Sequence, residues 1–164
     1  MLSTFKILLK NTPEDIIAVP FSNVTACQQL LSFISPTKRQ PSYTIWLTHI
    51  EQIHRFVYHI PNLAWELIEY ATEPLSLVYN QVKPIFPGEE IPDEICIRFV
   101  TEQPLRKVLP GQQVWLTSAL NMLKNKSAIG DWVDREVDMS RTMKEKRPVR
   151  MMRVYNENEF SFIS

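Results

Sequence analysis

Residues 95–100, with the sequence ICIRFV, form the segment from which the fold is most directly inferred. Five of the six residues are apolar, and a short continuous apolar run is typical of a strand buried inside a sheet. We therefore predict a strand over Glu94–Val100. Arg98 interrupts the run, and two interpretations are open: a buried or edge arginine that forms an ion pair, or an arginine that serves a binding site.

Outward from this segment, seven further stretches have strand patterns and four have the apolar spacing of a helix. The predicted strands are Phe5–Lys10, Ile16–Pro20, Tyr43–Leu47, Leu75–Tyr79, Glu94–Val100, Gln113–Ala119, Val149–Tyr155 and Glu159–Ile163. The predicted helices are Val24–Ile34, Ile50–Ile60, Leu63–Ala71 and Gln103–Leu109. Residues 83–92 read as a surface connection, because strand patterns resume directly after them. The sequence thus predicts one mixed α/β domain over residues 1–164.

The composition excludes several enzyme classes. The chain has 164 residues, of which 45% are hydrophobic and 22% charged, as in ordinary globular domains. Its three glycines, Gly88, Gly111 and Gly130, stand alone, which excludes the Rossmann turn, the P-loop and the nucleophile elbow of α/β-hydrolases. Lys and Arg balance Asp and Glu at 18 each. Any electrostatic site must therefore be local.

The cysteines and histidines favour neither a disulfide nor a metal site. Cys27 and Cys96 lie in apolar segments, as reduced core thiols of a cytosolic protein do. The sequence has neither a signal peptide nor an apolar run long enough to span a membrane, so we expect a cytoplasmic protein without a membrane partner. His49, His54 and His59 repeat every five residues and cannot share one helix face. We therefore expect no metal ligands among them.

Positive and hydroxyl residues occur near the ends of several predicted strands, where they would gather at one rim of a sheet. Arginine offers a bidentate fork, lysine a point charge and hydroxyls fine orientation, which suits an anionic nucleotide or an acyl-adenylate. Ser118 has no recognisable His/Asp partners, so we expect no nucleophile there. The candidate ligand-binding residues are Lys38, Arg39, Ser76, Arg98, Thr117 and Ser118.

Charges separate near the C-terminus, where acidic residues between 131 and 138 precede a basic run over 141–153. The basic half either binds RNA phosphates or forms a solvated face. Its candidate nucleic-acid contacts are Arg141, Lys144, Lys146 and Arg147.

Five segments follow one another along most of the chain: IAVP at 17–20, KRQP at 38–41, LAWELIEYATEPLSLV at 63–78, ICIRFVTEQPL at 95–105 and VWLTSALN at 114–121. Their order resembles that of the motifs of the YrdC-like family, the threonylcarbamoyl-adenylate synthases with their YciO and YwlC relatives. The resemblance implies a twisted open α/β sheet with flanking helices and a concave groove.

In that family the groove is positively charged and binds ATP, threonine and bicarbonate. The product is threonylcarbamoyl-AMP, released with pyrophosphate and used to modify tRNA, and Mg²⁺ would share the charge neutralisation. By position, Lys38 and Arg39 would contact phosphate or carboxylate, Arg98 would line the nucleotide groove, and Ser118 would hold a phosphate oxygen.

Several motif residues differ from the family pattern. Phe21 follows Pro20 where the family has threonine, residues 71–73 replace a Trp-Pro-Gly turn, and Leu120 replaces an asparagine, with Asn121 one place later. We therefore favour a non-catalytic protein that binds nucleotide or tRNA in the groove. Two alternatives stay open: an active threonylcarbamoyl-AMP synthase that uses ATP and Mg²⁺, and an interaction protein of unrelated mixed fold.

Overall fold

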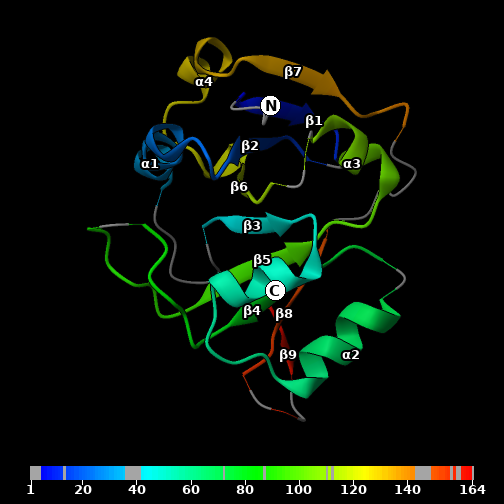
Figure 1. Cartoon of the computed structure of the whole chain (residues 1–164). Helices are drawn as coiled ribbons and strands as arrows, with labels where there is room; N and C mark the ends of the chain where they lie inside the picture. The colour runs from blue at the N-terminus through cyan, green and yellow to red at the C-terminus, as the bar shows by residue number, and fades with distance from the viewer. Residues whose placement is uncertain are drawn as a thin grey trace.

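A computed structural model describes residues 5–12, 14–35, 42–71, 73–86, 88–109, 111, 113–142, 149–155, 157 and 160–163. A nine-stranded sheet runs through the molecule in the order β7-β1-β2-β6-β3-β5-β4-β8-β9, from the top to the bottom of Figure 1. The strands are β1 (Ile7–Lys10), β2 (Ile16–Pro20), β3 (Thr44–Leu47), β4 (Leu75–Tyr79), β5 (Ile95–Phe99), β6 (Trp115–Ala119), β7 (Arg135–Asp138), β8 (Arg150–Arg153) and β9 (Ser161–Phe162). The helical segments are α1 (Val24–Phe33), η1 (Ile50–Arg55), α2 (Asn62–Tyr70), α3 (Gln103–Val108), η2 (Leu120–Met122) and α4 (Lys126–Trp132).

The mixed α/β class is confirmed, and each of the eight predicted strands contains a strand of the sheet. The sheet combines both kinds of pairing: β1 with β7, β3 with β5 and β4 with β8 are parallel, and the remaining neighbours are antiparallel. Parallel neighbours need long connections. Segments far apart in the sequence therefore lie side by side in the sheet.

One face of the sheet is apolar along the central strands. Ile45 of β3, Ile97 of β5 and Leu116 of β6 belong to one buried cluster, because alternate residues of a strand point to the same face. This cluster includes Leu30 of α1, Ile53 of η1 and Ala64 of α2. These three helical segments thus cover that face and supply the larger part of the core.

The opposite face is divided into an apolar half and a polar half. Trp46 and Trp115 pack there with Ala18 of β2 and with Leu105 of α3 in a second buried cluster. Beyond these tryptophans the same face carries buried polar side chains. They are Ser76, Arg98 and Thr117.

β7 and α4 were not predicted from the sequence, and neither was the short 3₁₀ segment η2. In β7 the side chains of Arg135, Glu136 and Asp138 are exposed, so the strand has no apolar alternation to reveal it and depends on parallel pairing with β1. In α4, Ile129 is the buried residue, and Gly130 lowers helix propensity. Pairing with β1 holds β7 in place and burial of Ile129 holds α4, where local pattern indicates neither element.

The predicted helix over Ile50–Ile60 is shorter than expected and is a 3₁₀ segment that ends at Arg55. The backbone that follows it bonds to residues near β4 instead. Tyr58 N–H donates to the carbonyl of Gln81 at 2.9 Å, and Lys83 N–H donates to that of Phe56 at 2.8 Å. Because these groups are used in sheet-like bonds, the helix cannot continue.

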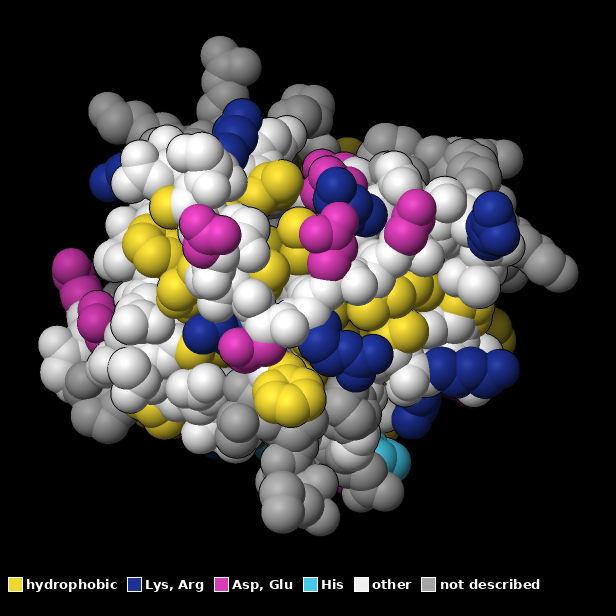
Figure 2. All heavy atoms as spheres, turned by 90° about the horizontal axis from the view of Figure 1, so that it is seen from above, with side chains coloured by type: hydrophobic (Ala, Val, Ile, Leu, Met, Phe, Trp, Pro, Cys, Tyr) yellow, Lys and Arg dark blue, Asp and Glu magenta, His cyan; other side chains and the backbone are white. Residues whose placement is uncertain are grey.

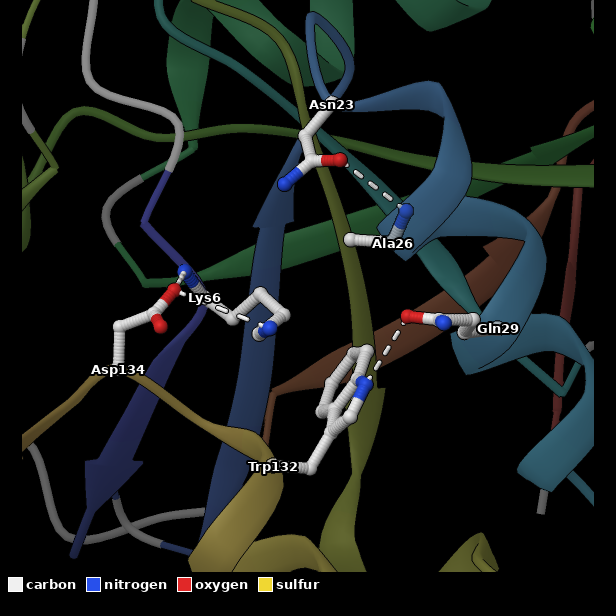
Figure 3. A network of polar contacts seen from close by, with 6 residues as sticks. All are labelled: Lys6, Asn23, Ala26, Gln29, Trp132 and Asp134. Carbon is white, nitrogen blue, oxygen red and sulfur yellow. Dashed lines mark hydrogen bonds and ion pairs between the residues drawn. The ribbon is translucent and has the colours of Figure 1, made fainter.

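A polar network ties α4 and β7 to the first part of the chain (Figure 3). The backbone N–H of Lys6 donates to Asp134 Oδ2 at 2.8 Å. The side-chain ammonium of Lys6 lies 4.9 Å from the ring centroid of Trp132. Trp132 Nε1 donates to Gln29 Oε1 of α1 at 3.1 Å. Figure 2, which looks onto this end of the molecule, shows acidic and basic side chains interspersed.

Both cysteine thiols are free and buried, as predicted. Burial raises the pKa of Cys27 to about 12 and that of Cys96 to about 11, so both are protonated at neutral pH. Within the described ranges, helices of the length and apolarity needed to cross a membrane do not occur, and His, Cys, Asp and Glu form no group of three that would hold a metal.

A bidentate ion pair fastens β8 to the end of β5. Arg153 Nε and Nη2 donate to Glu94 at 3.0 and 3.3 Å, and the Tyr155 hydroxyl also donates to Glu94. The hydrogen bond from Arg153 is the largest effect that holds the pKa of Glu94 below its usual value. This pair thus stabilises the fold above the unfolded pKa of Glu94, and the contribution disappears as the pH falls through the folded pKa.

We expect Glu94→Gln to lower the free energy of unfolding by about 1 kcal/mol at pH 7, since a half-exposed bidentate pair is lost. The deficit shrinks as the pH falls below about 4, because wild-type Glu94 is then protonated as well. Urea unfolding of both proteins at several pH values measures this difference in the free energy of unfolding. Glu90→Gln, at an exposed position, is the control, and an equal deficit at pH 3 and pH 7 contradicts the assignment.

Candidate functional site

A hollow of about 460 Å³ opens on the polar half of the sheet. Four residues predicted from the sequence line it together: Ser76, Arg98, Thr117 and Ser118. They come from β4, β5 and β6, which are separated by up to some 40 positions of chain. The other lining residues are Glu14, Ile16, Ser42, Tyr43, Thr44, Trp46, Ala119, Asn121, Met122, Val149, Arg150, Met151, Phe162 and Ile163.

Strand register explains why these residues meet. Arg98 lies directly opposite Trp46 of β3 on one side and Ser76 of β4 on the other. Thr44 lies opposite Thr117 of β6, two residues before Trp46 and therefore on the same face. Residues opposite each other in a sheet have neighbouring side chains. Two cross-strand rows, one through Arg98 and one through Thr44, thus form the floor of the hollow.

Arg98 is the strongest electrostatic feature of this floor. It is 3% exposed, forms an ion pair with Glu102 through Nη2, and stacks over the Trp46 ring at 4.9 Å. Burial lowers the pKa of Arg98, and Glu102 opposes that shift. Its Nε is buried and has no hydrogen-bond partner among the described residues. Arg98 is therefore a buried ion-pair residue that also lines the hollow and retains one unsatisfied donor.

The hydroxyls around the hollow already donate hydrogen bonds. Thr117 Oγ1 donates to the carbonyl of Thr44 at 2.8 Å, and Thr44 Oγ1 donates to Cys96 Sγ at 3.5 Å. Ser118 Oγ donates to the carbonyl of Ser42 at 3.3 Å. A hydroxyl whose proton is engaged offers its lone pairs. In this arrangement the Thr117 oxygen suits an N–H or O–H donor of a ligand, while the Arg98 guanidinium suits an oxygen acceptor.

The Ser118 side chain points to the opposite face of the sheet from that of Thr117, because consecutive residues of a strand point to opposite faces. Its partner in β2 is Ile17, whose side chain belongs to the larger core cluster. Ser118 therefore reaches the hollow at the end of the strand rather than on its floor. A role for its hydroxyl at a phosphate oxygen stays a prediction.

Other predicted contacts are separated from the hollow or lie outside the described part of the chain. Lys38, Arg39, Lys144, Lys146 and Arg147 belong to ranges that the structure does not describe. Arg141 is exposed and is not among the lining residues. Within the same basic run, Arg153 binds Glu94, whereas Arg150 lines the hollow with its guanidinium 4.4 Å from the centroid of Phe162.

Sequence reasoning missed several contributors to the site, among them Trp46, Glu102 and Thr44. Trp46 and Thr44 reach Arg98 and Thr117 only through register, which a single sequence does not reveal. Glu102 carries a signal, since it follows Arg98 by four residues, but the two residues lie in different elements. Asn121, one place after the family's asparagine position, does line the hollow, whereas Leu120 packs against the core.

The ion pair between Arg98 and Glu102 is tested by a double-mutant cycle with Arg98→Met and Glu102→Gln. We expect a coupling energy of about 1–3 kcal/mol, because each single change leaves the other group without its charged partner. Urea unfolding of the four proteins at pH 7 gives the value. Additive effects within about 0.5 kcal/mol would show that the two side chains act independently.

Comparisons with known proteins identify the kind of fold that carries this hollow. Neither the scan against protein-family models nor the search of curated proteins gives a match for this sequence. Among solved structures, P. abyssi Sua5 (H234A/Y235A) is similar with a TM-score of 0.67 and 14% identity, over 94% of this chain and 48% of that one. E. coli YciO is similar with a TM-score of 0.61 and 13% identity, over 98% of this chain and 82% of that one.

Full-length HypF, in its phosphate- and nucleotide-bound form, matches with a TM-score of 0.55 and 11% identity, over 92% of this chain and 25% of that one. This chain thus spans about half the length of the Sua5 structure and a quarter of that HypF. At such identities the likeness concerns the fold. The protein has the twisted, mixed α/β sheet of YrdC-like domains.

Proposed function

We propose that this protein binds a nucleotide in the hollow on the polar half of its sheet, as a binding protein rather than an enzyme. The observation that carries the proposal is the buried Nε of Arg98, a residue that lines the hollow; this nitrogen has no hydrogen-bond partner within the described ranges. A buried donor without a partner is costly, and an anionic ligand oxygen would satisfy it.

The surroundings of Arg98 suit the other parts of a nucleotide. Tyr43 and Phe162 give the hollow aromatic walls, and a base packs well on aromatic rings. Arg150 adds a second guanidinium to the lining, and Thr117 offers lone pairs to ribose or base donors. The YrdC-like fold supports the proposal by likeness, since a nucleotide-bound form is known for the similar HypF.

Loss of catalysis is part of the proposal, because several positions of the family's motifs have changed together. Leu120 has no donor or acceptor where the family has asparagine, and Phe21 replaces a hydroxyl. A Mg²⁺ ion would be held mainly by the nucleotide's own phosphates. Among the described lining residues Glu14 is the carboxylate that would join it. Binding of tRNA stays a prediction, since most of the basic run lies outside the described ranges.

The proposal predicts that AMP and ATP bind the purified protein and raise its melting temperature. Arg98→Met should weaken binding by roughly tenfold or more, because a charged hydrogen bond to the ligand is lost. Isothermal titration calorimetry measures the affinity. Arg141→Met is the matched control, since it removes an exposed guanidinium outside the hollow and should leave nucleotide affinity unchanged.

Two outcomes would contradict the proposal. If neither nucleotide binds the wild-type protein, or if Arg98→Met and Arg141→Met bind equally well, the hollow is not the site. Pyrophosphate release from ATP in the presence of threonine, bicarbonate and Mg²⁺, above that of a heat-killed control, would replace the binding role with the enzymatic one. A salt-dependent loss of tRNA binding in Arg141→Met would assign RNA to the basic run.

A further inference from the structure

We infer that Glu102 is a specificity-determining residue, which neutralises Arg98 and thereby makes the hollow prefer a nucleoside monophosphate to the corresponding triphosphate. This inference rests on the proposed function, because it states which nucleotide the same hollow selects. It follows from the contacts of Glu102 and from the balance of charge around the floor.

Glu102 is held in place at both carboxylate oxygens. Oε2 pairs with Arg98 Nη2, and Oε1 accepts a hydrogen bond from the backbone N–H of Thr101 at 3.3 Å. The residue also precedes the first residue of α3, where it is the N-cap. Its side chain is 20% exposed. A carboxylate fixed in this way is a permanent counterion rather than a mobile surface charge.

This counterion limits what Arg98 can offer to a ligand. An unpaired guanidinium presents a fork that takes two oxygens of a phosphate. In Arg98 one terminal nitrogen is engaged by Glu102, and Nε is the buried nitrogen without a partner in the described structure. A phosphate oxygen at Nε would satisfy that donor without displacing Glu102 from Nη2.

The charges around the hollow are balanced within the described part of the chain. The lining contains two cations, Arg98 and Arg150, and one carboxylate, Glu14; Glu102 adds a second carboxylate through its ion pair with Arg98. A triphosphate brings more negative charge out of water than a monophosphate and needs more positive charge to offset its desolvation. Balanced surroundings therefore favour the less charged nucleotide.

The test compares AMP with ATP by calorimetry, at equal ionic strength and without Mg²⁺, on the full chain and on Glu102→Gln. Glutamine keeps a carbonyl oxygen that accepts from Arg98 but removes the charge. We expect wild-type protein to bind AMP at least about threefold more tightly than ATP. In Glu102→Gln we expect ATP affinity to rise by about fivefold and AMP affinity by less than about twofold, because a full negative charge near the phosphates is gone.

Glu51→Gln is the control, since it removes the same charge from the exposed first turn of η1 and should leave the preference unchanged. If Glu102 had a merely structural role, Glu102→Gln would lower the affinity for both nucleotides alike. The ratio of the two affinities is therefore the decisive readout. Wild-type protein that binds ATP as tightly as AMP overturns the inference, as does an equal change for both nucleotides in Glu102→Gln.

Failure of the inference and failure of the proposed function give different results. If no nucleotide binds the wild-type protein, the proposed function fails and the inference with it. If both nucleotides bind but show no preference for AMP, the proposed function stands and the inference alone is wrong. Should Glu102→Gln not fold, the wild-type comparison still decides, together with the salt dependence of each affinity, which should be steeper for ATP.

Discussion

A guanidinium buried in the middle of a sheet is the constraint on which the polar half of this molecule depends. Removing a charge from water is expensive unless it is paired and hydrogen-bonded. Arg98 meets that requirement in part, through Glu102 on one side and the face of Trp46 on the other, while its Nε has no partner among the described residues. Glu102 directly precedes α3 and Trp46 belongs to β3, so the charge ties the start of α3 and β3 to β5.

The same arrangement explains how a chain with very few glycines can present a binding surface. In many nucleotide-binding folds, glycine-rich loops let backbone N–H groups approach a phosphate closely. Here the hollow is formed by strand side chains, and its floor consists of two cross-strand rows through Arg98 and Thr44. A site of this kind needs correct register more than it needs flexible backbone.

Much of this fold was predictable because most strands carry their own signal. Ile95–Phe99 is an apolar run, and Val24–Phe33 has a helical stripe after Asn23, whose side chain caps Ala26 N–H. The prediction missed β7, because its exposed Arg135 and Glu136 give no apolar pattern and the strand depends on pairing with a distant segment. It also placed the end of η1 too late, because backbone hydrogen bonds to Gln81 and Lys83 end this segment early.

The sequence predicted the kind of site but only some of its residues. Arg98, Ser76 and Thr117 stand out as polar residues within apolar strands, and such residues need a partner or a role. Trp46 and Thr44 look like ordinary strand residues until register places them beside Arg98 and Thr117. Glu102 pairs with the charge of Arg98, yet its sequence context is that of any residue at the start of a short helix.

The pairing of β1 with β7 has a consequence for how the chain reaches its native state. Ile7 lies beside Arg135 and Leu8 beside Glu136, so one flank of β1 finds its neighbour only after the chain has been synthesised as far as β7. Contacts between such distant parts of a chain slow folding, because a large loop must close before they form. Until then the open side of β1 is an unpaired strand edge, on which another molecule can add.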